Sequence, residues 1–121
     1  MTIRELYHGA DGDNILGIIR ERRMKPGRDG KIFFAEYQFE RAFMHGGDRR
    51  RMMTFVAKVR VQIPPGATVE RDTTSGVPNT LVVVTSAPIP AEVLELYIRK
   101  QAGTSVQTIR GVPDILRFLQ R

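Results

Sequence analysis

Cysteine and tryptophan are both missing from this chain of 121 residues. Without cysteine, disulfide bonds, thiolate metal sites and a cysteine nucleophile are all excluded. Long apolar runs are missing as well, since the run Leu81–Val84 is far shorter than the ~20 residues that span a bilayer. The N-terminal residues Met1–Glu5 do not begin the apolar segment of a signal peptide. These absences predict a soluble, cytoplasmic protein without a membrane partner.

Several common functional motifs are also missing. The sequence has no Walker A loop, no Gly-x-Gly-x-x-Gly pattern, no nucleophile elbow and no zinc motif. The two histidines, His8 and His45, lie far apart in the sequence and have no close carboxylate pattern, so we expect no metal site. The common nucleotide-binding, hydrolase and metalloenzyme classes therefore have no support.

The composition is that of an ordinary globular protein with a basic excess. At 41% hydrophobic and 26% charged residues, the chain is expected to form a single domain over residues 1–121. Its net charge is +6, and residues 1–60 hold 13 of the 19 basic side chains against 8 of the 13 acidic ones. Such charge attracts nucleic acid or a phosphorylated ligand, although solvated loops are the simpler interpretation. The basic clusters are Arg20, Arg22, Arg23, Lys25, Arg28 and Lys31, followed by Arg49, Arg50 and Arg51.

The first half of the chain predicts two strands and two helices. Residues 3–8 are typical of a short strand, and Asp13 or Asn14 is expected to cap a helix with an apolar face from Ile15 to Met24. Pro26 and Gly27 end that pattern. The apolar run 32–35 indicates a buried strand, and Phe39, Ala42 and Phe43 recur at helical spacing.

The second half predicts mostly strands. Residues 53–63 alternate strictly between apolar and polar side chains, 81–85 is an apolar strand after a polar loop at 73–79, and 93–99 is interpreted as a strand rather than a helix. A short amphipathic helix is expected at 115–119. Together these elements predict an α+β fold with a mostly antiparallel sheet and short flanking helices.

The order of local motifs is more specific. Tyr7-His8-Gly9 ends the first strand, Ile32-Phe33-Phe34-Ala35 forms another, and Ala42 lies on the helix that follows. This order resembles the ADP-ribosyltransferase superfamily, in particular the His-Tyr-Glu branch of the poly(ADP-ribose) polymerases and diphtheria toxin. The resemblance extends over residues 6–99 and is closest over 6–44. It implies a compact ADP-ribosyltransferase-like fold with a split sheet, and NAD as the cofactor.

The resemblance also implies roles for individual residues. Within Tyr7-His8-Gly9, His8 would hydrogen-bond a ribose hydroxyl of NAD, and the Gly9 backbone would hold the nicotinamide carboxamide. Phe33 stands where the family has a tyrosine that stacks on nicotinamide, which a phenylalanine can also do. The cofactor-binding set implied by the resemblance is completed by Phe34, Phe43 and Met44.

The third position of the family triad departs from the pattern. Thr80 stands where the family has a glutamate that stabilises the positive charge developing as nicotinamide leaves. Glu92, Glu36 or Glu70 would supply the carboxylate if this placement is shifted, and Glu92 is the catalytic candidate among them. Alternatively, the enzyme works without the carboxylate, as some mono-ADP-ribosyltransferase relatives do, or the domain is a degenerate, non-catalytic fold.

The implied function is transfer of ADP-ribose from NAD to a protein or nucleic-acid acceptor. A small basic transferase of this kind fits a bacterial toxin or effector, delivered to a target-cell cytoplasm and restrained by a cognate inhibitor protein. One alternative is a catalytically degenerate binding module. Another is an RNA-binding domain or one similar to the NAD-dependent RNA 2′-phosphotransferases, which suits the arginine clusters. This chain lacks their winged-helix domain and a match to their catalytic arginines.

Overall fold

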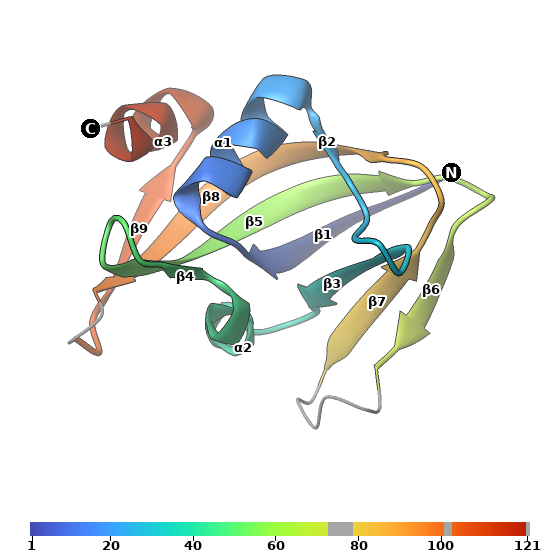
Figure 1. Ribbon diagram of the computed structural model, residues 1–121, viewed down its shortest axis with the longest axis horizontal. Helices are drawn as coiled ribbons and strands as arrows, with labels where there is room; N and C mark the ends of the chain where they lie inside the picture. The colour runs from blue at the N-terminus through green and yellow to red at the C-terminus, as the bar shows by residue number, and fades with distance from the viewer. Residues whose placement is uncertain (73–78, 101–102, 121) are drawn as a thin grey trace.

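The computed structural model describes residues 1–72, 79–100 and 103–120, and part of the predicted polar loop, 73–78, lies outside them. The described chain has an α+β fold, with a mainly antiparallel sheet of nine strands and three short helices (Figure 1). The helices are α1 (Gly12–Glu21), α2 (Phe39–Ala42), which continues into the 3-10 turn η1 (Phe43–His45), and α3 (Val112–Leu119). The strands are β1 (Thr2–Gly9), β2 (Arg23–Met24), β3 (Lys31–Ala35), β4 (Gly47–Asp48), β5 (Met53–Ile63), β6 (Thr68–Arg71), β7 (Thr80–Val84), β8 (Ile89–Lys100) and β9 (Val106–Arg110).

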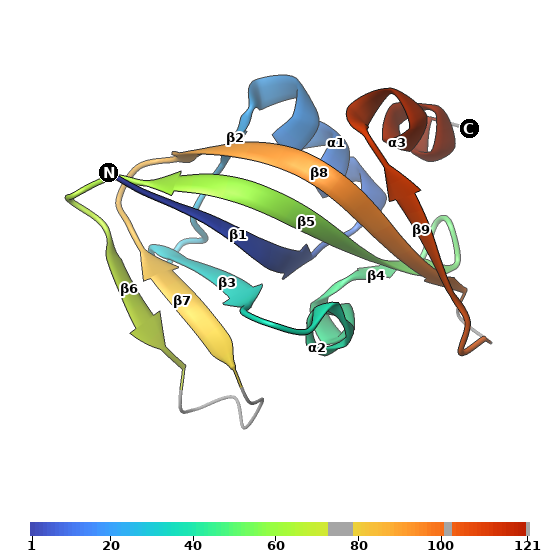
Figure 2. The same ribbon diagram turned by 180° about the vertical axis from the view of Figure 1, so that it is seen from behind.

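The central strand β5 organises the core. The strand is confirmed, and Phe55, Ala57 and Val59 are fully buried in the main core, but the alternation is not strict because Val56 is fully buried too, in a second cluster with Phe43 and Tyr97. Helices α1 and α3 lie side by side over the main-core face of the sheet, as Figures 1 and 2 show from opposite sides. On β8, the strand interpretation of 93–99 is also confirmed. The predicted α+β class is therefore correct.

Helix α1 begins earlier and ends earlier than predicted. Its cap is Asp11, whose carboxylate accepts a hydrogen bond from the Asn14 backbone N–H at 2.8 Å, so the expectation of Asp13 or Asn14 as the cap is wrong. The helix ends at Glu21 because Arg22 adopts a left-handed backbone conformation with φ of 55°. Met24 consequently lies in β2 rather than in the helix, although it is buried as its apolar character suggests.

The pairing between neighbouring strands of the sheet is shortest between β1 and β3. The sheet order is β2-β8-β5-β1-β3-β7-β6, with β4 and β9 pairing with β5 and β8 respectively. Strand β1 pairs with β5 along its whole length, and β3 pairs with β7 along its whole length, but β1 and β3 meet only at Tyr7 and Ala35. The two parts of the sheet can therefore diverge on either side of that pair.

A cluster of ion pairs around the buried Glu36 carboxylate reinforces this junction. The Glu36 carboxylate, just after β3, accepts hydrogen bonds from Arg4 of β1 at 2.8 Å and from Arg71 of β6 at 2.9 Å. Burial alone would raise the pKa of Glu36, but the hydrogen bonds from Arg4 and Arg71 outweigh it and hold the pKa below its ordinary value. The cluster joins β1 to the β3-β7-β6 part of the sheet.

None of the helices in residues 1–72, 79–100 and 103–120 is long and apolar enough to cross a membrane.

Candidate functional site

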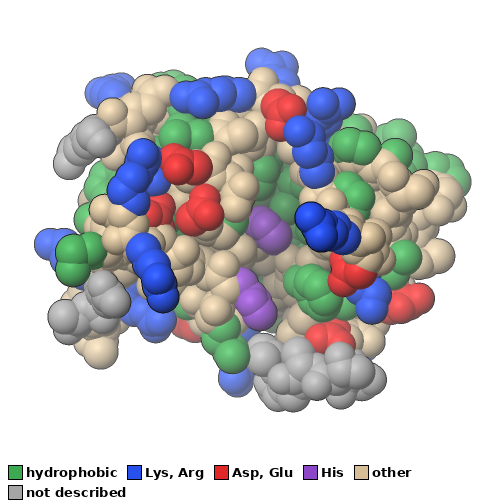
Figure 3. All heavy atoms as spheres, viewed as in Figure 1, with side chains coloured by type: hydrophobic (Ala, Val, Ile, Leu, Met, Phe, Trp, Pro, Cys, Tyr) green, Lys and Arg blue, Asp and Glu red, His purple; other side chains and the backbone are tan. Residues whose placement is uncertain are grey.

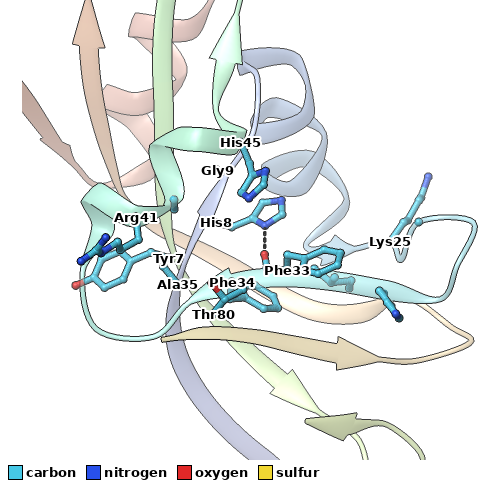
Figure 4. Close-up of a pocket in the computed structure, with 14 residues that line it drawn as sticks. Tyr7, His8, Gly9, Lys25, Phe33, Phe34, Ala35, Arg41, His45 and Thr80 are labelled. Carbon is cyan, nitrogen blue, oxygen red and sulfur yellow. Dashed lines mark hydrogen bonds between the residues drawn. The ribbon is translucent and has the colours of Figure 1, made fainter. Parts of the chain in front are cut away.

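A cavity of about 270 Å³, hereafter the His8 cavity, opens where β1 and β3 diverge. Its walls come from the end of β1, from β3 with the loop before it, and from α2 and η1. In Figure 3 the two histidines of the chain lie in a hollow at the centre of the molecular face. Figure 4 shows them as His8 and His45, one above the other.

His8 is fixed by a hydrogen bond across the gap in the sheet. Its Nδ1 lies 2.8 Å from the Phe33 carbonyl oxygen. Because a carbonyl only accepts, Nδ1 carries the proton and Nε2 is the ring's acceptor when the imidazole is neutral. Burial lowers the pKa of His8, and His45 nearby lowers it further, although the bond to Phe33 acts in the opposite direction. A neutral His8 can therefore accept a hydrogen bond from a ligand hydroxyl.

The two phenylalanines of β3 have different surroundings because neighbouring strand residues point to opposite faces. Phe33 is 39% exposed and lines the cavity, so its ring is available to stack on a flat ligand. Phe34 also contributes to the wall, but it is 2% exposed and belongs to the main core, with its ring centre 5.6 Å from that of His8. Of the pair, Phe33 is the ring that a ligand can cover.

Two glycines allow the α2–η1 segment to pack closely, Gly9 at its contact with β1 and Gly46 at its contact with β5. A Cβ on Gly9 would lie 1.9 Å from the Ala42 carbonyl oxygen, and one on Gly46 would lie 1.9 Å from the Phe55 carbonyl oxygen. Only glycine permits these backbone contacts. Gly9 and Ala42 therefore have a packing role in shaping the cavity wall that they line, whatever occupies the cavity.

His45 is a site residue that the sequence analysis missed. It was considered only as a metal ligand, with no metal site expected, yet His45 lines the cavity beside His8. Its position follows from the close packing of Gly46 against β5, where the Phe55 N–H also donates to the Gly46 carbonyl at 2.8 Å. The only sign of this position in the sequence was Gly46 directly after His45, because a glycine permits the close backbone contact that holds this segment against β5.

The remaining candidates divide into two groups. Tyr7 and Thr80 line the cavity together with His8 and Phe33, and Thr80 pairs with Ala35 in the sheet (Figure 4). Three others do not line it: Phe43 is buried against Val56 and Tyr97, Met44 is 69% exposed, and Glu92 lies on β8 with Arg60 at 3.6 Å.

No acidic side chain is among the described residues that line the cavity. Glu36 is engaged by Arg4 and Arg71, and Glu70 lies on the exposed strand β6. The cavity does have three cationic side chains, Lys25, Lys31 and Arg41, which we call the cavity rim.

The rim is open to an anion. Within the described chain, Lys31 and Arg41 form no ion pair, while Lys25 lies 3.2 Å from Glu21. Lys31 and Arg41, with no acidic side chain among the described residues of the cavity wall, favour a negatively charged ligand, whereas Asp11, Asp13 and Glu21 line the adjoining groove that shares Lys25.

A second groove of about 420 Å³ continues from the cavity along α1. The two spaces share His8, Gly9, Lys25 and His45. The N-terminus of α1 borders this groove but is already capped, because Gly12 N–H donates to Asp48 at 2.8 Å and Asn14 N–H donates to Asp11. A phosphate bound here would therefore depend on rim side chains such as Lys25 rather than on the helix N-terminus.

The chain matches no protein-family model, no curated protein and no solved structure with which it was compared. Within the part of the chain that the structure describes, no group of three or more histidine, aspartate or glutamate side chains is arranged to hold a metal ion. The arrangement offers a hydrogen-bond acceptor at His8, a flat surface at Phe33 and cations for phosphate.

Proposed function

We propose that this protein binds NAD in the His8 cavity and transfers ADP-ribose to an acceptor, on an ADP-ribosyltransferase-like fold. The observation that carries the proposal is the juxtaposition of a fixed His8 imidazole, the exposed Phe33 ring and the cationic rim around one cavity. These are three features that a ligand with a ribose, a flat ring and phosphates would use. The order of motifs along the chain supports the same interpretation.

The size of the cavity fits one end of a dinucleotide. Its volume of about 270 Å³ lies below the ~300–1,000 Å³ of sites that enclose a whole small molecule. The nicotinamide and its ribose would occupy the cavity, stacked on Phe33 and hydrogen-bonded to His8 Nε2. The adenosine would continue into the groove along α1, and the pyrophosphate would lie near Lys25, which borders both spaces.

The chemistry requires one bond to break and one to form. The bond between ribose C1′ and the nicotinamide nitrogen breaks, and nicotinamide leaves with the electron pair. An acceptor oxygen or nitrogen then bonds to C1′ and loses its proton to solvent. His8 and Phe33 would orient the reacting ribose and the leaving ring, so that part of the barrier is removed by positioning.

A second candidate function is ligand binding without catalysis. It is favoured by Thr80, which lines the cavity where the resemblance places a catalytic glutamate, and by the lack of acidic residues among the described cavity residues. Electrostatic stabilisation of developing charge is usually the largest catalytic contribution, so its loss would leave a binding module.

The first experiment is calorimetric titration with NAD. We expect binding to the wild type, a loss of about tenfold or more in affinity in His8→Ala and Phe33→Ala, and no change in Asp114→Asn, whose side chain is exposed on α3. Circular dichroism checks that the variants are folded. A folded wild type that does not bind NAD at millimolar concentration would exclude the proposal.

The second experiment separates the two candidates by measuring nicotinamide release. Release by the wild type that disappears in His8→Ala shows that the cavity cleaves the bond between nicotinamide and ribose, and it excludes a binding module without catalysis. If the wild type binds NAD without releasing nicotinamide, Thr80→Glu supplies a carboxylate at the cavity wall. Release gained by that variant would identify the wild type as a binding module that has lost its catalytic group.

A further inference from the structure

The His8 cavity contains few groups that could take a proton from the acceptor of a transfer reaction. Among the described residues, the titratable side chains that line it are Tyr7, His8, Lys25, Lys31, Arg41 and His45. Lysine and arginine side chains are ordinarily protonated at neutral pH, and a tyrosine hydroxyl ordinarily keeps its proton there. Of the side-chain types present, only histidine commonly has an unprotonated nitrogen that can act as a base.

His8 is not available for this proton. Its Nδ1 carries the proton that it donates to the Phe33 carbonyl oxygen, 2.8 Å away. Its Nε2 is the acceptor that would hold a ribose hydroxyl of NAD in the proposed function. Both nitrogens are therefore engaged once NAD is bound, and His45 is left as the base.

His45 borders the place where the reacting ribose would lie. Figure 4 shows its imidazole above that of His8, and a charge on His45 lowers the pKa of His8. It lines both the cavity and the groove along α1, which the two halves of NAD would occupy. The residue is exposed, and its ring forms no hydrogen bond or ion pair with any other residue in 1–72, 79–100 and 103–120. An acceptor and bulk water can both reach this ring.

The backbone around His45 holds the residue at the cavity wall. The Gly46 N–H donates to the Phe43 carbonyl at 3.2 Å, which closes the 3-10 turn, and the Phe55 N–H donates to the Gly46 carbonyl at 2.8 Å. The turn is therefore tied to β5 directly after His45. A catalytic group is most effective when the fold positions it before the substrate arrives.

No carboxylate of the described chain is placed to act in its stead. None lines the cavity, and the three that line the adjoining groove lie where the adenosine would bind. Each of the three is already engaged by neighbouring donors: Asp11 by Asn14, Asp13 by Arg50 and Arg51, and Glu21 by Arg23 and Lys25.

We infer that His45 is the general base of the proposed transfer and that the acceptor is a hydroxyl group. The inference rests on the proposed function. The bond between ribose C1′ and the nicotinamide nitrogen breaks, and its electron pair leaves with nicotinamide. The hydroxyl oxygen bonds to C1′ and gives its proton to an unprotonated nitrogen of His45, which passes it to solvent. A carboxylate acceptor has already lost its proton at neutral pH, so a base in the cavity serves a hydroxyl.

The test measures nicotinamide release from NAD with water as the hydroxyl acceptor, without and with sodium azide. We expect His45→Gln to lower release about a hundredfold, the size of a typical general-base contribution. Azide is an anion that attacks C1′ without losing a proton, so it should restore release by the variant to within about tenfold of the wild type. Mass spectrometry should then identify ADP-ribosyl azide as the product. Azide does not repair a residue whose role is only structural.

NAD affinity, measured by calorimetry, separates the base from a residue that binds NAD. His45→Gln should bind NAD within about threefold of the wild type, whereas His8→Ala should lose about tenfold or more and should not be rescued by azide. Met44→Gln is the matched control, because Met44 precedes His45 in η1, is 69% exposed and does not line the cavity. It should behave as the wild type in both conditions, and circular dichroism checks that all variants are folded.

A second measurement tests the hydroxyl acceptor. Methanol and sodium acetate at equal concentrations offer NAD a hydroxyl and a carboxylate together, and mass spectrometry identifies the products. We expect more methyl ADP-ribose than acetyl ADP-ribose from the wild type, and about a hundredfold less of the methyl product from His45→Gln. An excess of the acetyl product from the wild type would identify a carboxylate acceptor and overturn the inference.

The remaining outcomes distinguish failure of the inference from failure of the proposed function. Release that is unchanged in His45→Gln, or lowered and not restored by azide, overturns the general base, while release by the wild type still supports the proposed function. A folded wild type that does not bind NAD contradicts both. Binding of NAD without release contradicts the general base and leaves the binding module as the function.

Discussion

The Arg49–Arg51 turn and the cavity rim carry similar positive charge but differ in what surrounds it. In the turn, the Arg51 guanidinium donates to Asp48 at 2.9 Å, to Asp13 at 3.2 Å and to the Leu119 carbonyl at 2.9 Å. Arg50 also reaches Asp13, at 3.1 Å. These contacts join the start of α1 and the end of α3 to the turn before β5, so most of the positive charge here is matched within the protein.

The positive charge of the cavity rim is compensated less than that of the turn. Within the described chain only Lys25 has an acidic partner there, and both members of that pair are substantially exposed. The comparison teaches that a run of three arginines in the sequence does not by itself indicate free positive charge, because the fold places carboxylates against two of them.

Removing Arg51 should have the largest effect. Its side chain is 13% exposed, and Arg51→Ala would leave the buried Asp48 carboxylate without its guanidinium partner. We expect a loss of about 3 kcal/mol in the free energy of unfolding, measured with urea. Arg51→Lys retains the charge but not the fork of donors, so it should lose less than the alanine variant. A loss below about 1 kcal/mol in Arg51→Ala would contradict the structural role of the turn.

Acid should have the second-largest effect, because it protonates the Asp48 and Glu36 carboxylates and so weakens their ion pairs. Burial alone would raise the pKa of Asp48, but the N–H groups of Arg51 and Gly12 and the Arg51 guanidinium lower it, as Arg4 and Arg71 do for Glu36. A carboxylate whose pKa is lowered by folding contributes its full stability at pH values above the pKa that it has in the unfolded chain. That stability is lost as the pH falls through the pKa that it has in the folded protein. We therefore expect unfolding free energy to fall with acidification below the ordinary glutamate value of 4.5.

Glu36→Gln isolates one of these contributions. The variant should be less stable at pH 7 and should lose less stability than the wild type between pH 5 and pH 3, as measured by urea unfolding across that range. His8 affects stability at higher pH than Glu36 does. Because the pKa of His8 is lowered in the folded protein, the stability that neutral His8 contributes decreases as the pH falls below its ordinary value of 6.5. If the free energy of unfolding falls by the same amount in the variant and in the wild type below pH 4.5, Glu36 does not hold the junction together.

A strand of this fold could be predicted from the sequence only where one of its faces is buried. The alternation of apolar side chains over residues 53–63 identified β5, because its Phe55, Ala57 and Val59 face packs on the main core, although Val56 interrupts the pattern and is buried too. Strands β6 and β9 were missed, and both are almost wholly exposed. A strand with neither face buried has no alternation of side chains to reveal it, and its pairing is decided by the neighbouring strand.

The candidate site was predictable only where its residues lie on the two neighbouring strands β1 and β3. His8, Gly9 and Phe33 come together because β1 and β3 are neighbours in the sheet. His45 depends instead on backbone contacts at Gly9 and Gly46 between segments far apart in the sequence, which no local spacing encodes. Glu92 was the catalytic candidate for a shifted third triad position, but it lies on β8, two strands away from β1, and does not line the cavity.

The rim should respond to substitution in the opposite way to Arg51. We expect the double substitution Lys25→Ala and Lys31→Ala to lower the affinity for NAD about fivefold, because each exposed charge contributes modestly to phosphate binding. The free energy of unfolding should change by less than about 0.5 kcal/mol. Calorimetry at low and high salt checks the cause, since screening should reduce the difference between variant and wild type. A variant that binds NAD as tightly as the wild type at low salt would remove the rim from the ligand site.

Arg50→Ala should have the smallest effect, and it tests the comparison inside the turn itself. Arg50 and its partner Asp13 are 70% and 65% exposed, whereas Arg51 and Asp48 are 13% and 4% exposed. Water already screens the exposed pair, and holding two long side chains together offsets much of the attraction. We therefore expect a change within about 0.5 kcal/mol in urea unfolding and unchanged NAD affinity. A loss as large as that of Arg51→Ala would mean that stability depends on the total charge of the turn, and not on the buried contact between Arg51 and Asp48.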